Sequence, residues 1–485
     1  MVNNCPIFDE SYKGLQVNYC VSAECENFGI SDPALYKDVK NDQNLNIYFC
    51  PKCGSYPQKI DNKTVYQSIQ LQKQYHQLKV TSCPHKQCGT HGFAVHTHMD
   101  KYRSFGKTST LKQRYQCREC KCVFTDRFSG INTHLELQSA LFYGMKYNQG
   151  VRNLCALEGI TPKAFYTHQR DMVDRLKYLA HIKEYQFFNT ADECHLTTDY
   201  RYINKASGAI IVASVHNQSG YVLGFDTNIS KNIDKSCLLD KPKSKRRVRV
   251  SPIEEKGDLM SQIFAGYDEI MSRTNYLDPA SNGTVMIRKS SELTQPYLCS
   301  FAHAFVMHRK LKYKSQLYYF VEQETMLRNA FINASLDELK TQGAQLFYYK
   351  ESLEKMEWFD KDRLHVKNIG WWQDKWGFVA MPDGTKGACH IKGNGLTLEK
   401  WRALTVETSL NDVIRYLDLS SSFLRTLVNT VNHQSINDWL HIFTTYYNYC
   451  IPKKNGKTPA QLMGFTDRPM GLSELLSGEH TVKAR

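Results

Sequence analysis

Eight cysteines in the first 130 residues form a repeated pattern, and this pattern limits the possible folds more than any other part of the sequence. Each copy has a C-x4-C pair followed by a C-x2-C pair. The cysteines are Cys20, Cys25, Cys50 and Cys53 in the first copy and Cys83, Cys88, Cys117 and Cys120 in the second. The copies are offset by 63 residues at the first pair and by 67 at the second, which indicates a duplicated unit.

Two close cysteine pairs joined by about 25–30 residues are typical of a zinc ribbon, in which four thiolates form a tetrahedron around Zn²⁺. A unit this small buries too little surface to fold without its metal. The chain has 16 cysteines, and its first ten residues lack a signal-peptide pattern, so we expect paired spacings to indicate metal sites before disulfides. We therefore predict two structural zinc sites, in ribbons spanning residues 1–65 and 66–130. Neither metal is expected to be catalytic, because a four-cysteine site has no open position.

The second predicted ribbon is strongly basic between residues 101 and 121. Its charged and aromatic residues are Lys101, Arg103, Lys107, Lys112, Arg114, Arg118 and Lys121, with Glu119, Tyr102, Phe105 and Tyr115 among them. Basic and aromatic side chains on a small rigid scaffold favour contact with phosphates and stacking on bases. The candidate DNA-binding residues of this ribbon are Lys107, Lys112, Arg114 and Arg118. A merely solvated basic face is the alternative.

The composition of the whole chain favours a folded protein with a polyanionic partner. Its 485 residues carry 62 Lys and Arg against 48 Asp and Glu, a formal charge of +14. Apolar residues at 41% and the length suggest a folded chain of about three domains. The longest apolar run, residues 209–215, is too short to span a membrane, and residues 1–10 lack a signal-peptide pattern. We expect neither a membrane nor a secreted protein, but a cytoplasmic one associated with the nucleoid.

Residues 131–185 are predicted to form a small all-α helix-turn-helix DNA-binding domain. Apolar residues between 151 and 157 form a helical stripe that ends at Gly159, because glycine tolerates the positive φ of a helix end. Thr161 is a good N-cap for the next helix, and Pro162 suits its first position. The residues expected to share the recognition face are Lys163, Tyr166, Thr167 and Arg170. A plain helical hairpin is the alternative.

Residues 186–450 are predicted to form an α/β catalytic core. The predicted strands cover residues 185–193, 208–215, 221–229 and 315–324, and a long helix is predicted over 408–431. Carboxylates at the ends of such elements suit two Mg²⁺ ions about 3.5–4 Å apart, which activate a water or a 3′-hydroxyl at a phosphodiester. Acids at strand ends are common in proteins of every kind, so their spacing alone leaves a structural role open.

Four stretches resemble bacterial insertion-sequence transposases and occur in the order of that family. Residues 441–465, HIFTTYYNYCIPKKNGKTPAQLMGF, are similar to the family's C-terminal end, and residues 105–124 to the zinc ribbon that opens many of these proteins. Residues 218–225 resemble the second and third core strands. Residues 321–331, VEQETMLRNAF, resemble a strand-to-helix junction where the family has Asp-x-Asp followed by arginine. The similarity covers about residues 80–465.

The resemblance implies a ribonuclease-H-like mixed sheet with flanking helices, a DDE or DDD acid triad, and DNA cleavage and strand transfer that depend on Mg²⁺ or Mn²⁺. The acids chosen for the triad are Asp192, Glu322 and Asp418. Asp192 is chosen because it ends the first predicted strand, and Asp199 is its rival. Asp418 is chosen because Arg425 follows it by seven residues, as in the family's helix. The alternatives for the third acid are Glu407 and Asp412.

Glu322 departs from the family pattern, which has aspartate at this position. Its extra methylene displaces the carboxylate in a site that tolerates little misplacement. The predicted function is a DNA transposase that acts on the ends of a mobile element and on double-stranded target DNA as a homodimer or larger assembly. The alternative is a domesticated, catalytically weak or inactive relative that binds DNA as a regulator or interference factor. A zinc-ribbon protein acting on RNA is a weaker third interpretation, because it leaves the C-terminal motif unexplained.

Three further segments complete the predicted organisation. Residues 241–249, KPKSKRRVR, have six basic residues in nine and are predicted to lie over the DNA path, with a solvated insertion as the alternative. The candidate DNA-binding residues there are Lys245, Arg246 and Arg247. A Trp-rich region of about residues 350–400 is predicted to be an insertion in the core, and residues 451–485 a C-terminal tail.

Overall fold

The computed structural model of the chain has two units, each built from two separate stretches of sequence. The described residues are 8, 10–39, 47–204, 208–230, 257–273, 277, 292–356, 363–370, 372–425, 427 and 432–477. Unit 1 consists of Met1–Tyr75 and Thr190–Ser422, and unit 2 of His76–Asn189 and Phe423–Arg485. The two cysteine repeats therefore belong to different units, and residues 66–75, predicted to open the second ribbon, belong to α1 of unit 1 (Asn62–Tyr75). The predicted core of residues 186–450 is divided between the units, because the chain after Ser422 packs with unit 2.

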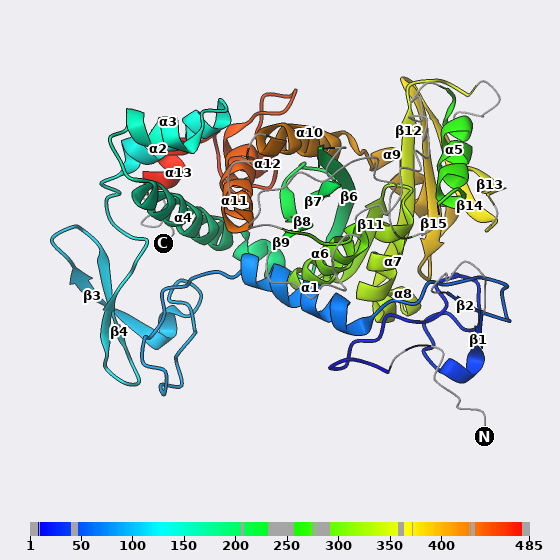
Figure 1. The fold of residues 1–485 in the computed structure, drawn as a ribbon, viewed down its shortest axis with the longest axis horizontal. Helices are drawn as coiled ribbons and strands as arrows, with labels where there is room; N and C mark the ends of the chain where they lie inside the picture. The colour runs from blue at the N-terminus through cyan, green and yellow to red at the C-terminus, as the bar shows by residue number, and fades with distance from the viewer. Residues whose placement is uncertain are drawn as a thin grey trace. The chain divides into compact units, whose positions relative to one another are not determined.

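Unit 1 contains a mixed sheet of eight strands in the order β13-β14-β15-β12-β11-β6-β7-β8 (Figure 1). The strands are β6 (Glu193–Asn204), β7 (Ala209–His216), β8 (Val222–Thr227), β11 (Gln316–Val321), β12 (Ala344–Ser352), β13 (His365–Ile369), β14 (Asp374–Met381) and β15 (Gly384–Lys392). β6, β11 and β12 are parallel neighbours, whereas the other adjacent strands are antiparallel. Residues 209–215 of β7 are all buried, which explains their continuous apolar run.

Helices cover this sheet. They are α1 (Asn62–Tyr75), α5 (Leu259–Met271), α6 (Pro296–Lys310), α7 (Thr325–Ala334), α8 (Leu336–Lys340), α9 (Leu398–Glu407) and α10 (Asn411–Arg425). α6 packs against β7 and β8 and also against α1 and α7, and Figure 1 shows α1 running alongside α6. α5 packs on β12 and β15, and α9 on β14 and β15. Two further strands, β9 (Ile229–Ser230) and β10 (Glu292–Leu293), form a short antiparallel pair.

The Trp-rich region extends the main sheet, since β13, β14 and β15 continue it beyond β12. Trp376 is fully buried, and its indole Nε1 donates to the Tyr267 hydroxyl at 3.0 Å. Trp401 is also buried, and its Nε1 donates to the Ala388 carbonyl at 3.3 Å. These two tryptophans therefore serve packing, as indole rings with a satisfied N–H commonly do. Trp358 and Trp371 lie outside the described residues.

Unit 2 combines a small antiparallel sheet with helices. The strands are β3 (Tyr102–Lys107), β4 (Gln113–Cys117) and β5 (Val123–Thr125), and the helices are α2 (Leu135–Lys146), α3 (Val151–Leu157), α4 (Pro162–Asn189), α11 (His433–Cys450), α12 (Pro459–Leu462) and α13 (Leu472–Ser477). α4 packs against α11, while α13 packs against α2 and α4. The predicted C-terminal tail therefore contributes two short packed helices to this unit.

The turn between α3 and α4 has its glycine, threonine and proline in the predicted positions. Gly159 has φ +63°, a conformation that favours glycine, and it follows the last turn of α3. The Thr161 hydroxyl accepts a hydrogen bond from the Ala164 N–H at 3.2 Å, which caps α4, and Pro162 is its first residue. The predicted helix boundaries at this turn are confirmed.

One predicted strand is wrong. Residues 185–189 continue α4, and the first strand of the main sheet begins only at Glu193. The aromatic run there favours a strand locally, but nothing between Pro162 and Asn189 breaks the helix. The Asn189 amide donates back to the Tyr185 carbonyl at 2.7 Å in the last turn of the helix.

The protein is thus a mixed α/β chain with one large mixed sheet. In the described part of the chain, no helix combines the length and the apolar character needed to cross a bilayer.

Candidate functional site

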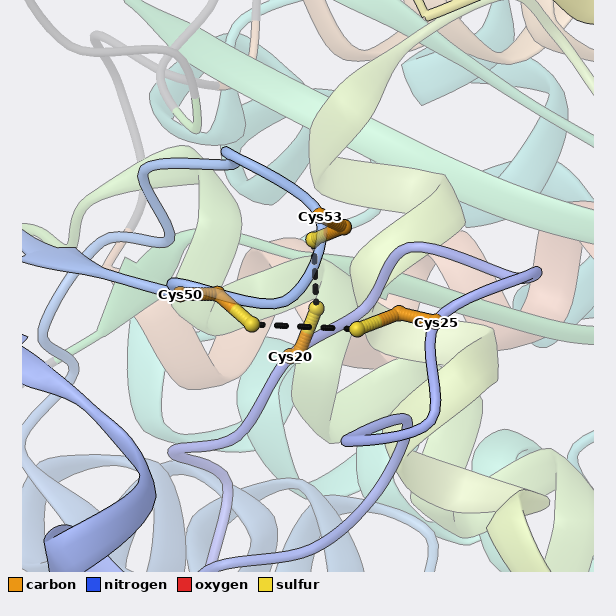
Figure 2. A group of neighbouring side chains, drawn as sticks. All are labelled: Cys20, Cys25, Cys50 and Cys53. Atoms are coloured by element: carbon orange, nitrogen blue, oxygen red, sulfur yellow. Dashed lines mark hydrogen bonds between the residues drawn. The ribbon is translucent and has the colours of Figure 1, made fainter.

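The four cysteines of the first repeat converge on one point, with the sulfur atoms facing one another (Figure 2). Cys20 Sγ lies 3.5 Å from Cys53 Sγ, and Cys25 Sγ lies 3.7 Å from Cys50 Sγ. Four sulfurs bound at 2.3 Å around a tetrahedral ion lie about 3.8 Å apart. The cluster therefore has the size of a four-cysteine metal site and could hold an ion such as zinc.

The second repeat builds an equivalent cluster. Cys83 Sγ lies 3.4 Å from Cys120 Sγ, and Cys88 Sγ lies 3.8 Å from Cys117 Sγ. The eight cysteines predicted to bind metal are therefore brought together in the predicted two groups of four. Cys122 is not part of the second group.

The duplication extends to a tyrosine that the sequence reasoning missed. The Tyr36 hydroxyl accepts from the Cys20 N–H at 2.9 Å and donates to the Ile30 carbonyl. In the second copy, the Tyr102 hydroxyl accepts from the Cys83 N–H at 3.3 Å and donates to a carbonyl at 2.6 Å. Tyr36 comes directly before β1 (Lys37–Asp38), the first strand of its ribbon, and Tyr102 is the first residue of β3. The signal available in the sequence is their shared spacing of 66 residues, close to that of the cysteines.

One thiol in each cluster is stabilised as a thiolate. Burial opposes ionisation of Cys53, but hydrogen bonds from Ser55 lower its pKa to about 6. Burial likewise opposes ionisation of Cys117, but the Thr90 hydroxyl, 3.0 Å from its sulfur, helps to lower its pKa to about 6. Since the thiolate is the form that binds metal, these contacts favour metal binding near neutral pH.

The first ribbon is packed onto the main sheet of unit 1. Lys392 at the end of β15 donates to the Ala23 carbonyl, and its ammonium lies 4.7 Å from the Phe28 ring centre. Lys340 of α8 donates to the Gly29 carbonyl at 3.2 Å. Gly29 has φ +65°, and a Cβ there would come within 2.6 Å of Leu336. The chain that carries Cys20 and Cys25 is therefore fastened to the sheet and its helices.

The second ribbon packs onto α4 of unit 2 through its base. Phe128 stacks on Tyr178 with ring centres 4.7 Å apart. The Asp174 carboxylate accepts from Lys79 at 2.8 Å and lies 3.5 Å from Arg127. These contacts leave β3 exposed beyond its first residue, Tyr102, while β4 is half-buried as far as the buried Cys117.

The exposed hairpin carries a basic and aromatic cluster. The guanidinium carbons of Arg103 and Arg114 lie 5.9 and 5.3 Å from the centre of the Phe105 ring. Such cation–π contacts hold arginines on a surface without neutralising them. Lys107 is exposed nearby at the end of β3, and Lys112 is half-buried just before β4. Arg118 is exposed, but its Nε donates to the Tyr102 carbonyl at 3.1 Å.

The predicted recognition residues line a pocket rather than a free helix face. Its lining residues are Lys163, Tyr166, Thr167, Gln169 and Arg170 from α4, with Asn432, Gln434, Ser435 and Asp438 from the start of α11, and its volume is about 300 Å³. Gln169 and Ser435 join the two helices through hydrogen bonds of 3.0 and 2.9 Å. The structure thus brings the four predicted residues together, and α11 borders them on one side.

Asp192, chosen as the first acid of the triad, lies away from Glu322. It precedes β6, where Glu193 pairs with Gln316, whereas Glu322 follows the pair formed by Thr198 and Val321. Seven residues of extended chain separate Asp192 from Asp199, a distance of about 23 Å. Asp192 and Glu322 therefore stand near opposite ends of paired parallel strands and cannot share a metal ion. The structure therefore does not bring Asp192 together with Glu322, and it places the rival, Asp199, beside Glu322 instead.

Asp199 lies beside Glu322. The Glu322 N–H donates to the Thr198 carbonyl at 3.1 Å, which places the two acids on adjacent strands at the same level. Burial, and then the charge of Glu322, raise the pKa of Asp199 to about 7. Two carboxylates forced together in a buried site have this effect, and a bound cation would relieve it.

Lys350, which the sequence did not point to, lies with Asp199 and Glu322, and these three residues form the acid cluster of unit 1. Its ammonium lies 2.6 Å from a Glu322 carboxylate oxygen. Burial alone would lower the pKa of Lys350, but the charges of Glu322 and Asp199 outweigh this effect and raise it. No motif in the sequence marks Lys350, because its place depends on β12 lying beside β11.

Asp418 of α10 is joined to β6 through Arg201. Arg201 is two residues beyond Asp199 on β6, so the two side chains point to the same face of the sheet. The Arg201 Nε donates to Asp418 of α10 at 2.9 Å. Asp412, one of the alternatives, lies instead against Gly220 in the turn between β7 and β8.

Glu324, two residues after Glu322, binds an arginine and has a structural role. Its carboxylate binds both terminal nitrogens of Arg273, at 2.7 and 2.9 Å, and it caps the N-terminus of α7. It is 2% exposed, so it is a buried, paired charge rather than a free ligand.

A separate polar network lies between the sheet and α6. His303 Nδ1 lies 2.7 Å from Asp226, and its Nε2 lies 2.8 Å from the Ser214 hydroxyl. The arrangement has the order of a hydrolase triad, but all three residues are at most 2% exposed. No substrate reaches them, so the network is a satisfied part of the core.

The candidate residues Lys245, Arg246 and Arg247 lie outside the described residues. Comparison of the sequence with models of known protein families found no match, and comparison with curated proteins found none either.

Proposed function

We propose that this protein is a metal-dependent DNA transposase, whose unit 1 cleaves and joins DNA strands and whose unit 2 binds the element ends. The observation that carries the proposal is the pairing of Asp199 with Glu322 on two adjacent parallel strands, in a site where burial and then the charge of Glu322 raise the pKa of Asp199. Such a site suits hard divalent cations.

The topology supports a ribonuclease-H-like core for this unit. β6, the first strand of the sheet, is central, with the antiparallel β7 and then β8 on one side and the parallel β11 and β12 on the other. Asp199 lies on β6 and Glu322 directly after β11, and these two strands are adjacent and parallel. The insertion β13–β15 extends this arrangement without interrupting it.

The residues proposed to hold Mg²⁺ or Mn²⁺ are Asp199, Glu322 and Asp418. When bound, such ions polarise the scissile phosphate and lower the pKa of the attacking water. The chain's own part is to place three carboxylates on rigid elements. The first attack by water breaks a phosphodiester and leaves a 3′-hydroxyl, and this hydroxyl then attacks target DNA. The two cysteine clusters are proposed to hold structural zinc.

The central test is DNA cleavage in Mg²⁺ or Mn²⁺ on fragments carrying the ends of the element around the gene. We expect Asp199→Asn to lower nicking by at least about 10³-fold, because one carboxylate of a rigid metal site is lost. Asp192→Asn is the matched control and is expected to cleave like the unchanged protein. Equal nicking by the Asp199 variant would overturn the proposed site.

A second candidate function rests on a specific observation. Glu322 and Asp418 are each paired with a cation of the chain, Lys350 and Arg201, so part of the site's charge is balanced without metal. This favours a protein that binds element ends but cuts them weakly, as a regulator or interference factor. Tight, end-specific binding without nicking by the unchanged protein would support this alternative and oppose the transposase.

For DNA binding, we propose that the β3–β4 hairpin is a principal contact, because a two-stranded ribbon fits the major groove. Replacing both Arg103 and Arg114 by alanine is expected to weaken binding to duplex ends and to reduce the slope of log affinity against log salt by about 2. Lys37 is the equivalent of Arg103 in the first ribbon, and Lys37→Ala is the control. An unchanged salt slope in the double variant would show that the hairpin does not contact DNA.

A further inference from the structure

The acid cluster of unit 1 contains a cation that belongs to the chain. Lys350 lies near the end of β12, the strand next to β11, and its ammonium is 2.6 Å from Glu322. The two side chains are 19% and 25% exposed, so solvent screens the pair only in part. This is a short, charge-assisted contact in a mostly buried site.

The charges around Lys350 form a group of alternating sign. Asp199 and Glu322 contribute two negative charges when ionised, and Lys350 interacts with both of them. Arg201 then pairs with Asp418, at 2.9 Å. Removing the ammonium would leave Glu322 beside Asp199 with no compensating charge from β12, which is costly for buried carboxylates.

We propose that the Lys350 ammonium is the resident cation of the acid cluster and that a divalent metal ion must displace it from Glu322 to bind. The inference rests on the proposed function, because it concerns the same acids. In the metal-free protein, Lys350 keeps Asp199 and Glu322 close together. When metal is present, the same charge competes with it, so Lys350 sets the metal concentration at which the site fills.

The longer side chain of Glu322 fits this role. A glutamate at the end of β11 reaches the ammonium on the neighbouring strand, and its extra methylene gives it freedom to turn from Lys350 to a metal ion. The departure from the family's aspartate and the presence of Lys350 are therefore two parts of one arrangement.

The experiment measures Mn²⁺ binding to the full-length, zinc-loaded protein by electron paramagnetic resonance, without DNA. We expect Lys350→Met, which keeps the length of the side chain and removes its charge, to bind Mn²⁺ about tenfold more tightly than the unchanged protein. Lys350→Arg keeps the charge and is expected to retain the original affinity. Lys375→Met, on β14 and two strands away from β12, controls for the loss of a positive charge from an exposed position of the same sheet.

The outcomes separate this inference from the proposed function. Unchanged or weaker Mn²⁺ binding by Lys350→Met overturns the inference, even where the unchanged protein cleaves DNA. Tighter binding by Lys350→Met but not by Lys350→Arg supports it, even where neither protein cleaves. Lys350→Gln, which still donates to Glu322, is measured in parallel so that misfolding of the methionine variant does not decide the result, and unchanged affinity of a folded Lys350→Gln likewise overturns the inference.

Discussion

Replacing Cys20 with serine is expected to loosen the main sheet of unit 1 as well as the first ribbon, whereas the same change at Cys83 is expected to affect unit 2 alone. Loss of one thiolate opens a proposed zinc site whose binding energy, about 10–16 kcal/mol in small zinc domains, supports the local fold. The first ribbon is fastened to the sheet by Lys392 and Lys340, so its unfolding removes these contacts too.

The size of the effect on unit 1 follows from the contacts that are lost. Two hydrogen bonds to backbone carbonyls contribute about 1 kcal/mol each, and the ammonium of Lys392 on Phe28 about 0.5–1 kcal/mol more. The free energy of opening should therefore fall by about 1.5–2 kcal/mol at the end of β15 and by about 1 kcal/mol in α8.

Hydrogen exchange read by mass spectrometry checks this prediction, with zinc content measured on the same samples. Each serine variant is expected to retain one zinc per chain in place of two. Protection in β15 and α8 should fall for Cys20→Ser and stay unchanged for Cys83→Ser. Equal protection of these segments in both variants would mean that the first ribbon does not brace the sheet.

The two ribbons show what the sequence predicts well. Metal ligation needs four cysteines at fixed short spacings, so the spacing alone assigned Cys20, Cys25, Cys50 and Cys53 to one group. The sequence does not show that one ribbon is fastened to the sheet while the other presents a basic hairpin. That difference depends on long-range partners such as Lys392, which is more than 360 residues away from Ala23.

The acids show why part of a site resists prediction. Asp192 and Asp199 are both plausible ends of a strand when only local composition is read. The register between β6 and β11 separates them, because it pairs Thr198 with Val321 and so sets Asp199 beside Glu322. This register depends on two strands that lie more than 100 residues apart in the chain. The residue pattern of either strand alone therefore does not predict which residues stand opposite one another.

The division of the chain into two units was also not predictable from the sequence. The predicted catalytic core runs to residue 450 and so includes α11, yet α11 packs against α4 in unit 2. Helix α11 has an apolar face along most of its length, and such a face fits a sheet or another helix equally well. Its partner becomes clear only from the fold.

Asp199→Asn is expected to stabilise unit 1 at neutral and alkaline pH and to leave its stability unchanged in acid. The folded-state pKa of Asp199, about 7, is raised above the unfolded value of about 3.9 by burial and by Glu322. Between these two values the unfolded chain releases the proton and the folded chain keeps it. Stability from this group is therefore fully present below about pH 4 and is lost as the pH rises to about 7.

The loss amounts to about 4 kcal/mol, since the pKa values of Asp199 in the folded and unfolded chain differ by roughly three, and a difference of one in pKa corresponds to about 1.36 kcal/mol. Urea titrations of the two proteins between about pH 4.5 and pH 8 measure the difference in free energy of unfolding, and this difference should grow with pH and level off above about pH 7. Asp192→Asn, an exposed carboxyl outside the cluster, is the control. A constant difference across the range would show that Asp199 does not carry a raised pKa. If the difference instead shrinks when Mn²⁺ is added at about pH 8, a divalent ion supplies the charge that the Asp199–Glu322 pair lacks, as the proposed metal site requires.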